Sequence, residues 1–244
     1  MIRIERAREI VSTAVIAAVL YAVPAGAQMD QGAVQTAPEP PSLADLPDQL
    51  VRVVEHPDEE VLEVIIGPAE LEAGGHHLRL PVQLMEVPFA GWLHGFEWEI
   101  RNAAGEKLPD DLLHHVNFID PDHRELFAPI PRRVAAAGRE TDKLEVPHLI
   151  GYPIEANTRL LVSAMLAAPD ERNYQDVYLH VRFFYSKAGE NFIAPRDIYL
   201  FYVDVMGPVG LKDFPVPPGR TVKSWEGSPA IDGRILAIGG HLHN

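Results

Sequence analysis

Short apolar and aromatic runs, separated by Gly, Pro, Asn and Asp, recur along the chain from residue 61 onward. Within residues 95–101 apolar and polar side chains alternate, as in a strand that faces the core on one side and water on the other. Residues 160–166 are almost wholly apolar, which indicates an inner strand of a two-sheet sandwich. The pattern predicts strands over residues 61–66, 77–84, 92–101, 113–119, 160–166, 177–185, 198–205 and 234–238.

Residues 132–139 are the one helix candidate, and Gly138 within them weakens that interpretation. Many short strands separated by turn residues are typical of an all-β protein. We therefore expect an antiparallel β-sandwich or jelly roll over residues 49–206.

The N-terminus has the pattern of a secretory signal peptide over residues 1–27. Three arginines precede an apolar stretch over residues 10–23, and Ala25-Gly26-Ala27 supplies a small-residue cleavage site. The apolar stretch is short for a membrane span, and an uncleaved anchor is the alternative. We expect an exported protein, secreted or periplasmic, with no membrane span after cleavage.

Two further segments have the composition of linkers. Residues 28–48 are rich in Pro, Gln, Ala and Ser and predict a disordered tether, and residues 207–220 contain four prolines that predict an extended connector. Beyond the connector, residues 221–244 can form one or two strands. They either pair with the preceding sheet or begin a second β domain that this chain lacks.

Composition narrows the choice of partners and metal ligands. The chain carries 21 Lys and Arg against 35 Asp and Glu, and after removal of the predicted signal 18 remain against 33. This acidity argues against nucleic acid as a partner. With no cysteine, an exported chain has neither a disulfide framework nor thiolate ligands, so a metal would be held by His, carboxylate or Met.

Two histidine pairs are the candidate metal ligands. His241 and His243 lie two apart at the end of an apolar run, so on a strand both imidazoles would share one face. His114 and His115 are adjacent and would face opposite sides of a regular strand. They can converge only at a strand end or a bulge. The alternative for the adjacent pair is one rim histidine beside a half-buried one.

Three segments together resemble a known enzyme family. These are Leu-Leu-His-His-Val at residues 112–116, the apolar strand at 160–166, and Gly-Gly-His-Leu-His at 239–243 after the proline-rich connector. Their order and spacing resemble the type II copper, ascorbate-dependent monooxygenases, the family of peptidylglycine alpha-hydroxylating monooxygenase, and also the plant stress-upregulated nodulin-like proteins. The resemblance implies two jelly-roll domains, each holding a copper ion, and a small-molecule or peptide substrate that the sequence does not identify.

The resemblance assigns His114 and His115 to the first copper, and His241 and His243 to the second. The third ligand of the first copper would match Ala167, which has no donor atom, and the Met ligand of the second would lie beyond Asn244. His180, on a neighbouring strand, could replace the missing ligand, although such a histidine is more often satisfied by a backbone carbonyl. His76 and His77 are interpreted as a turn residue followed by a strand residue.

Two hypotheses follow from the sequence. The first is an exported copper-binding jelly-roll protein that resembles the N-terminal part of these monooxygenases, either a fragment or an incomplete enzyme. If completed by a second domain, it would be a copper-dependent monooxygenase. The second is a non-catalytic exported β-sandwich that binds or supports a partner without any metal. Thermal unfolding with and without copper would distinguish them, because a ligand of the native state raises the unfolding midpoint.

Overall fold

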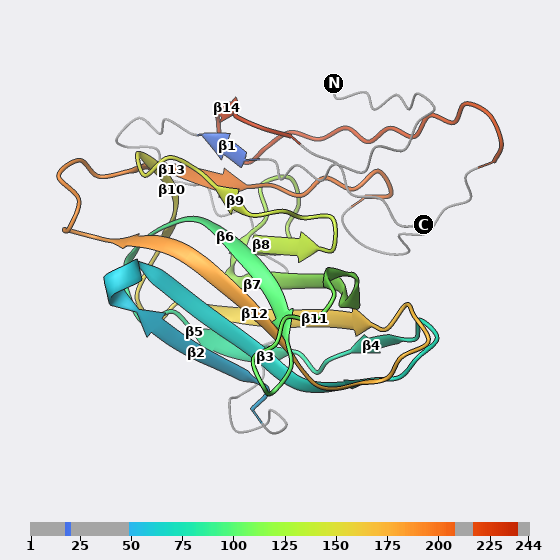
Figure 1. Cartoon of the computed structure of the whole chain (residues 1–244). Helices are drawn as coiled ribbons and strands as arrows, with labels where there is room; N and C mark the ends of the chain where they lie inside the picture. The colour runs from blue at the N-terminus through green and yellow to red at the C-terminus, as the bar shows by residue number, and fades with distance from the viewer. Residues whose placement is uncertain (1–17, 21–48, 208–216, 239–244) are drawn as a thin grey trace.

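The computed structural model describes residues 18–20, 49–207 and 217–238, and two packed β-sheets make up this part of the chain (Figure 1). The larger sheet has nine strands, eight of them in one path with β9 (Leu144–Glu145) paired to β6. In order along the path they are β14 (Arg234–Ile235), β1 (Ala18–Leu20), β13 (Arg196–Leu200), β10 (Ile150–Ile154), β6 (Gly91–Arg101), β12 (Tyr174–Lys187), β3 (Val61–Leu71) and β2 (Val51–His56).

The smaller sheet has five strands, and it carries the adjacent histidine pair. Its order is β4 (His77–Arg79), β11 (Arg159–Ala167), β7 (Leu113–Arg124) and β8 (Pro131–Gly138), and β5 (Gln83–Glu86) pairs with the other half of β11. Two single-turn 3-10 helices, η2 (Pro57–Glu59) and η3 (Asp110–Leu112), precede β3 and β7. The described part of the chain is therefore an all-β sandwich, as the sequence predicts.

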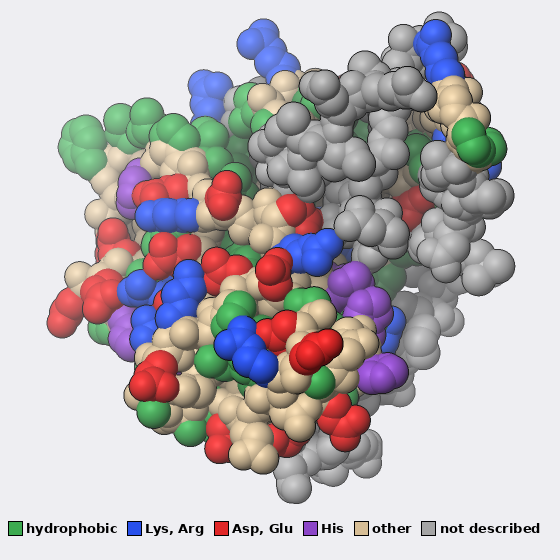
Figure 2. Space-filling model, turned by 45° about the vertical axis from the view of Figure 1, so that its right-hand side comes forward, with side chains coloured by type: hydrophobic (Ala, Val, Ile, Leu, Met, Phe, Trp, Pro, Cys, Tyr) green, Lys and Arg blue, Asp and Glu red, His purple; other side chains and the backbone are tan. Residues whose placement is uncertain are grey.

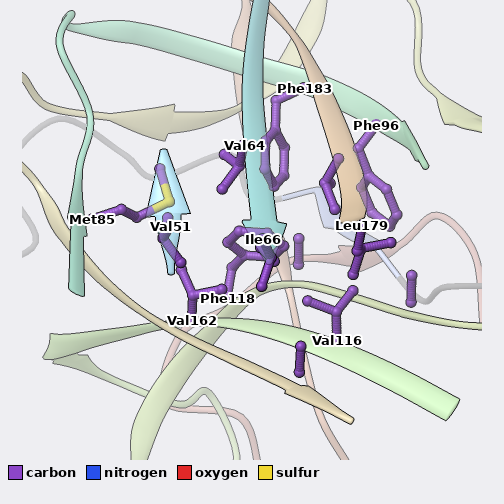
Figure 3. Close-up of a cluster of buried hydrophobic side chains, with 14 of the residues drawn as sticks. Val51, Val64, Ile66, Met85, Phe96, Val116, Phe118, Val162, Leu179 and Phe183 are labelled. Carbon is purple, nitrogen blue, oxygen red and sulfur yellow. The ribbon is translucent and has the colours of Figure 1, made fainter. Parts of the chain in front are cut away.

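The core lies between the two sheets and is formed by alternate residues of their strands (Figure 3). Phe118 of β7 meets Phe183 of β12 edge to face, with ring centroids 4.9 Å apart. Along β11 the even-numbered residues from Leu160 to Leu166 are buried in this core. The odd-numbered residues therefore lie on the outer face of the five-stranded sheet.

The prediction of a helix over residues 132–139 is wrong, because this segment forms the edge strand β8. Val134, Ala135 and Ala137 are buried, and β8 pairs with β7 from Pro131 to Gly138. Alanines favour a helix locally, but burial against a neighbouring strand decides the conformation here.

Other strand boundaries differ from the predicted ones for local reasons. The strand predicted over residues 77–84 is divided into β4 and β5, with Pro81 between them, because proline has no N–H for a strand ladder. The strand predicted over 198–205 ends at Leu200, and the one over 234–238 is limited to two residues. The sequence pattern does not predict strands β1, β2, β8, β9 and β10.

The described residues after the connector contact the sandwich. The Ala230 N–H donates to the Leu126 carbonyl at 2.8 Å, and Trp225 lies against Phe127 with ring centroids 6.1 Å apart. Strand β14 pairs with β1, which also pairs with β13. Strand β1 falls inside the predicted signal peptide. The predicted tether at 28–48 and most of the predicted connector lie outside the described residues.

Candidate metal site

A β-bulge in β7 brings His114 and His115 to the same face of the sheet. Met165 of β11 pairs with His115, but the next residue of β11, Leu166, pairs with Leu113, so β7 has one extra residue at this point. Leu113 and Val116 are buried in the core, whereas both histidines between them are half-buried on the outer face. Their ring centroids are 4.8 Å apart. This is the bulge that convergence of adjacent histidines requires.

A third imidazole, that of His77, joins this pair from β4. His77 pairs with Ala167 of β11, and its ring stacks on that of His114 with centroids 4.3 Å apart and an interplanar angle of 25°. Strand β11 lies between β4 and β7, so the two histidine backbones are roughly 9.5 Å apart at ordinary strand spacing. Ala167, the ladder partner of His77 on the intervening strand, is 7% exposed.

Sequence reasoning missed His77 as a member of this cluster. Its local signal, a Gly-Gly turn followed by two histidines, indicates only that a strand begins there. The contact depends on the register of β4 against β11, which the sequence pattern does not specify. Figure 2, which turns forward the side of the molecule where β4 lies, shows histidine side chains at the surface.

The residues that pair with His115 on the two neighbouring strands are a methionine and a glycine. Met165 pairs with His115 on one side, and Gly138 pairs with it on the other. A Cβ atom at Gly138 would lie 2.7 and 2.8 Å from the carboxylate oxygens of Glu140, so this carboxylate occupies the space that a side chain at position 138 would take. Met165 and Gly138 are therefore the ladder neighbours of His115, and the Glu140 carboxylate lies over Gly138.

The chemistry of these donors suits a copper ion. Imidazole nitrogen binds copper and zinc, and thioether sulfur favours Cu(I). Two imidazoles on one ion, with metal–nitrogen distances of about 2.0 Å, have ring centroids roughly 4.5–5 Å apart. The 4.8 Å separation of His114 and His115 fits this range. Within the described ranges, however, no group of three or more His, Asp or Glu side chains is placed so that it could hold a metal ion.

His180 is not brought to this pair. It lies on β12, between the core residues Leu179 and Val181, so its side chain is on the outer face of the other sheet. Its Nδ1 lies 2.9 Å from Glu63 Oε1, and His56 Nε2 lies 2.9 Å from Glu63 Oε2. A carboxylate, rather than a backbone carbonyl, is its partner. His241 and His243 lie outside the described residues.

The Glu63 carboxylate is held ionised by its two histidine neighbours. Burial acts to raise the pKa of Glu63, but its hydrogen bonds with His180 and His56 outweigh burial and lower the pKa below its ordinary value. A carboxylate held between two histidines orders the outer face of β3 and β12. The contact with Glu63 explains the position of the His180 side chain without a bound metal ion.

A Ser–His contact in the core has a structural role. His94 is 1% exposed, and its Nδ1 and Nε2 lie 2.8 Å from the Ile150 carbonyl and from Ser186 Oγ. Burial lowers the pKa of His94, so the neutral ring is favoured, donating from Nδ1 and accepting from the serine hydroxyl. Because Ser186 is 2% exposed, this hydroxyl is closed to a substrate.

A charged hollow of about 410 Å³ lies on the outer face of the nine-stranded sheet. The residues that line it include Trp98, whose Nε1–H donates to the Thr141 carbonyl. Arg182 pairs with Glu97 at 2.9 Å and with Glu59 at 2.7 Å, and other acidic and basic groups around it are paired in the same way. Such mutually neutralising pairs favour an ordered, solvated surface over a ligand site.

Comparisons of this chain with protein-family models, with curated proteins and with solved structures give no match. None of the helices in the described ranges is long and apolar enough to cross a membrane.

Proposed function

We propose that this protein is exported and binds copper through His114 and His115, on the outer face of the five-stranded sheet. The observation that carries the proposal is the β7 bulge, which places both imidazoles on one face with centroids 4.8 Å apart. A bulge leaves one residue of the strand unpaired, and bulges often redirect a side chain at a functional site.

The resemblance to the type II copper monooxygenases adds support for copper. In this proposal His114 and His115 take the place of the adjacent ligands of the first copper, and β11 takes the place of the apolar strand beside them. His241 and His243 form a second half-site. A monooxygenase activity would need a further domain, from a longer chain or a partner.

The residues of the cluster have distinct parts in this proposal. His114 and His115 bind the ion as neutral imidazoles, and the sheet holds their backbones in register with Met165 and Gly138. Copper, when bound, would supply a one-electron redox centre. Two imidazoles alone leave open positions on the ion, so binding is the function that the chain supports by itself.

The test compares the mature chain, residues 28–244, with the variants H114A/H115A, H241A/H243A and the combined fourfold variant. Copper bound after equilibrium dialysis is measured for each. We expect the wild type and H241A/H243A to retain one copper that H114A/H115A loses. Thermal unfolding gives a second measurement, because free copper at 100 times the dissociation constant stabilises the native state by about 2.7 kcal/mol.

Absence of specific copper binding would contradict the proposal. If the wild type binds no more copper than the fourfold variant, and copper leaves both unfolding midpoints unchanged, the metal proposal is wrong. The chain would then be a β-sandwich module that binds or supports a partner without a metal.

A further inference from the structure

We infer that removal of the signal peptide opens a slot one strand wide between β13 and β14, which accepts an extended apolar segment of another polypeptide. The inference rests on the export part of the proposed function, because strand β1 (Ala18–Leu20) lies inside the predicted signal peptide, residues 1–27. Strand β1 lies between β13 and β14 in the nine-stranded sheet (Figure 1). Cleavage after Ala27 would remove it and leave both neighbours without this partner.

The first argument is the backbone pairing of β1 on both of its edges. Its three residues pair antiparallel with residues 198–200 of β13, and two of them pair antiparallel with Arg234 and Ile235 of β14. At ordinary strand spacing, β13 and β14 are therefore roughly 9.5 Å apart, which is the width of one inserted strand. A strand in this position has ladder partners on both sides, whereas a peptide that joins an ordinary sheet edge has them on one side only.

The second argument is that each wall of the slot has contacts that do not involve β1. Strand β13 pairs with β10, and the Asp197 carboxylate accepts a hydrogen bond from Trp92 Nε1–H at 2.9 Å. Just before β14, the Ala230 N–H donates to the Leu126 carbonyl, and Ile231 packs against Leu126. All of these residues belong to the mature chain, so the slot keeps both walls after cleavage.

The third argument is the apolar character of the chain at β14. Ile235, Leu236 and Ile238 are 53%, 46% and 52% exposed, and among the described residues β14 has no ladder partner other than β1. Emptying the slot adds two unpaired backbone edges to this apolar surface, and such edges are where a further strand adds. The segment in the slot is Ala-Val-Leu, so the partner segment has an extended apolar sequence without proline.

The experiment uses the mature protein, residues 28–244, and a synthetic peptide with the sequence of residues 16–22, extended by lysines at both ends for solubility. Fluorescence anisotropy of the labelled peptide measures its affinity. The control peptide has proline in place of Val19 and Leu20. Consecutive N–H groups of a strand point to opposite edges, so two prolines remove a donor from each ladder.

Two variants of the mature protein place the binding at the slot. R234P/I235P changes the wall formed by β14, and V222P is the control, because Val222 is also exposed and lies outside the strands. Thermal midpoints show whether each variant is folded. Hydrogen exchange of the wild type, with and without peptide, is a second measurement that needs no variant.

We expect R234P/I235P and the control peptide each to weaken binding by about tenfold or more, because backbone hydrogen bonds are lost. V222P should bind as the wild type does. We expect the peptide to slow amide exchange at residues 198–200 and 234–235 by about tenfold or more.

The inference is refuted if the peptide does not bind the mature protein, or if V222P and R234P/I235P bind it equally well. Slow exchange at residues 198–200 without peptide would also refute it, because β14 would then have closed the slot. Export is tested separately, by the mass of the protein recovered from the periplasm of a bacterial host. A chain that keeps residues 1–27 there contradicts the proposed function, whereas failure of peptide binding contradicts the slot alone.

Discussion

The imidazole of His77 stacks on that of His114, although an entire strand separates their backbones. On that intervening strand, β11, the ladder partner of His77 is Ala167. The family resemblance places the missing third ligand of the first copper at Ala167. In the structure Ala167 lies on the strand between the two imidazoles, so a larger side chain there would crowd them.

Replacing Ala167 with leucine should therefore weaken copper binding. The larger side chain would crowd the His114 ring and shift it from its position beside His115, and we expect a loss of about tenfold in Cu(I) affinity, equivalent to about 1.4 kcal/mol. The matched control is A167S, which keeps the residue small. Chelator competition gives the affinities, and thermal unfolding without metal checks the folded state. An A167L protein that is folded and binds copper like A167S would show that this contact has no part in binding.

Replacing Met165 with leucine should lower the preference for Cu(I) and leave Zn(II) binding unchanged. The two side chains have similar volumes, so the fold should lose less than about 1.5 kcal/mol of stability. We expect a drop on the order of tenfold in Cu(I) affinity, because a soft sulfur beside His115 is removed. M85L is the control, since Met85 lies in the core between the sheets. Equal Cu(I) affinities in M165L and M85L would exclude the thioether from the site.

The contact between Phe118 and Phe183 should account for a large part of the packing between the sheets. Phe118 is 1% exposed and meets Phe183 edge to face. We expect F118A to lower the free energy of unfolding by about 3–5 kcal/mol, through lost burial and a cavity. V54A, at a position that is 38% exposed, should change it by less than about 0.5 kcal/mol. Urea unfolding measures both. Similar values for the two variants would contradict the position of the core.

The pair of Asp120 and His123 should make stability depend on pH. Asp120 is 3% exposed, and its carboxylate accepts from the His123 ring Nδ1–H at 2.8 Å and from the backbone N–H of Asp122 at 2.9 Å. The hydrogen bond to Asp120 raises the pKa of His123. Burial acts to raise the pKa of Asp120, but its hydrogen bonds with His123 and the backbone outweigh burial and lower the pKa.

The directions of these two pKa shifts determine how the stability of the fold changes with pH. The His123 contribution is complete below its ordinary pKa of 6.5 and is lost as the pH rises through the raised folded value. The Asp120 contribution is complete above its ordinary pKa of 3.8 and is lost as the pH falls through the lowered folded value. The pair therefore stabilises the fold most between these two ordinary values.

Unfolding of the wild type and H123Q in urea at pH 5 and pH 9 measures this contribution. We expect the wild type to exceed H123Q by less than about 1 kcal/mol at pH 5, since the histidine side chain is more than half exposed, and by almost nothing at pH 9. A difference that grew between pH 5 and pH 9 would have the wrong sign and would contradict the ion pair.

The extent to which the sequence predicts this structure differs between elements. The alternation in β6 and the apolar run of β11 predict strands at nearly the observed positions, because each element buries one set of alternate residues. The alanines of β8 favour a helix locally, and only pairing with β7 makes that segment a strand. Local pattern therefore predicts the fold class and fails where tertiary pairing opposes propensity.

The same distinction applies to the candidate site. Adjacent histidines predict that a bulge or strand end is needed, and β7 has the bulge between Leu113 and His115. The sequence suggests His180 only as a replacement for the missing third ligand, and the alternation of β12 places it on the opposite outer face, beside Glu63. Only the register of β4 against β11 brings His77 into contact with His114. Which distant histidine joins a pair depends on strand order, which no local pattern contains.

Anomalous diffraction from crystals of the copper-treated mature protein tests the central claim most directly. Data collected on both sides of the copper absorption edge locate the ion without reference to any assumed site. The proposal predicts an anomalous peak within bonding distance, about 2.0–2.3 Å, of imidazole nitrogens of His114 and His115. Copper bound only elsewhere, with no peak at this pair, would contradict it.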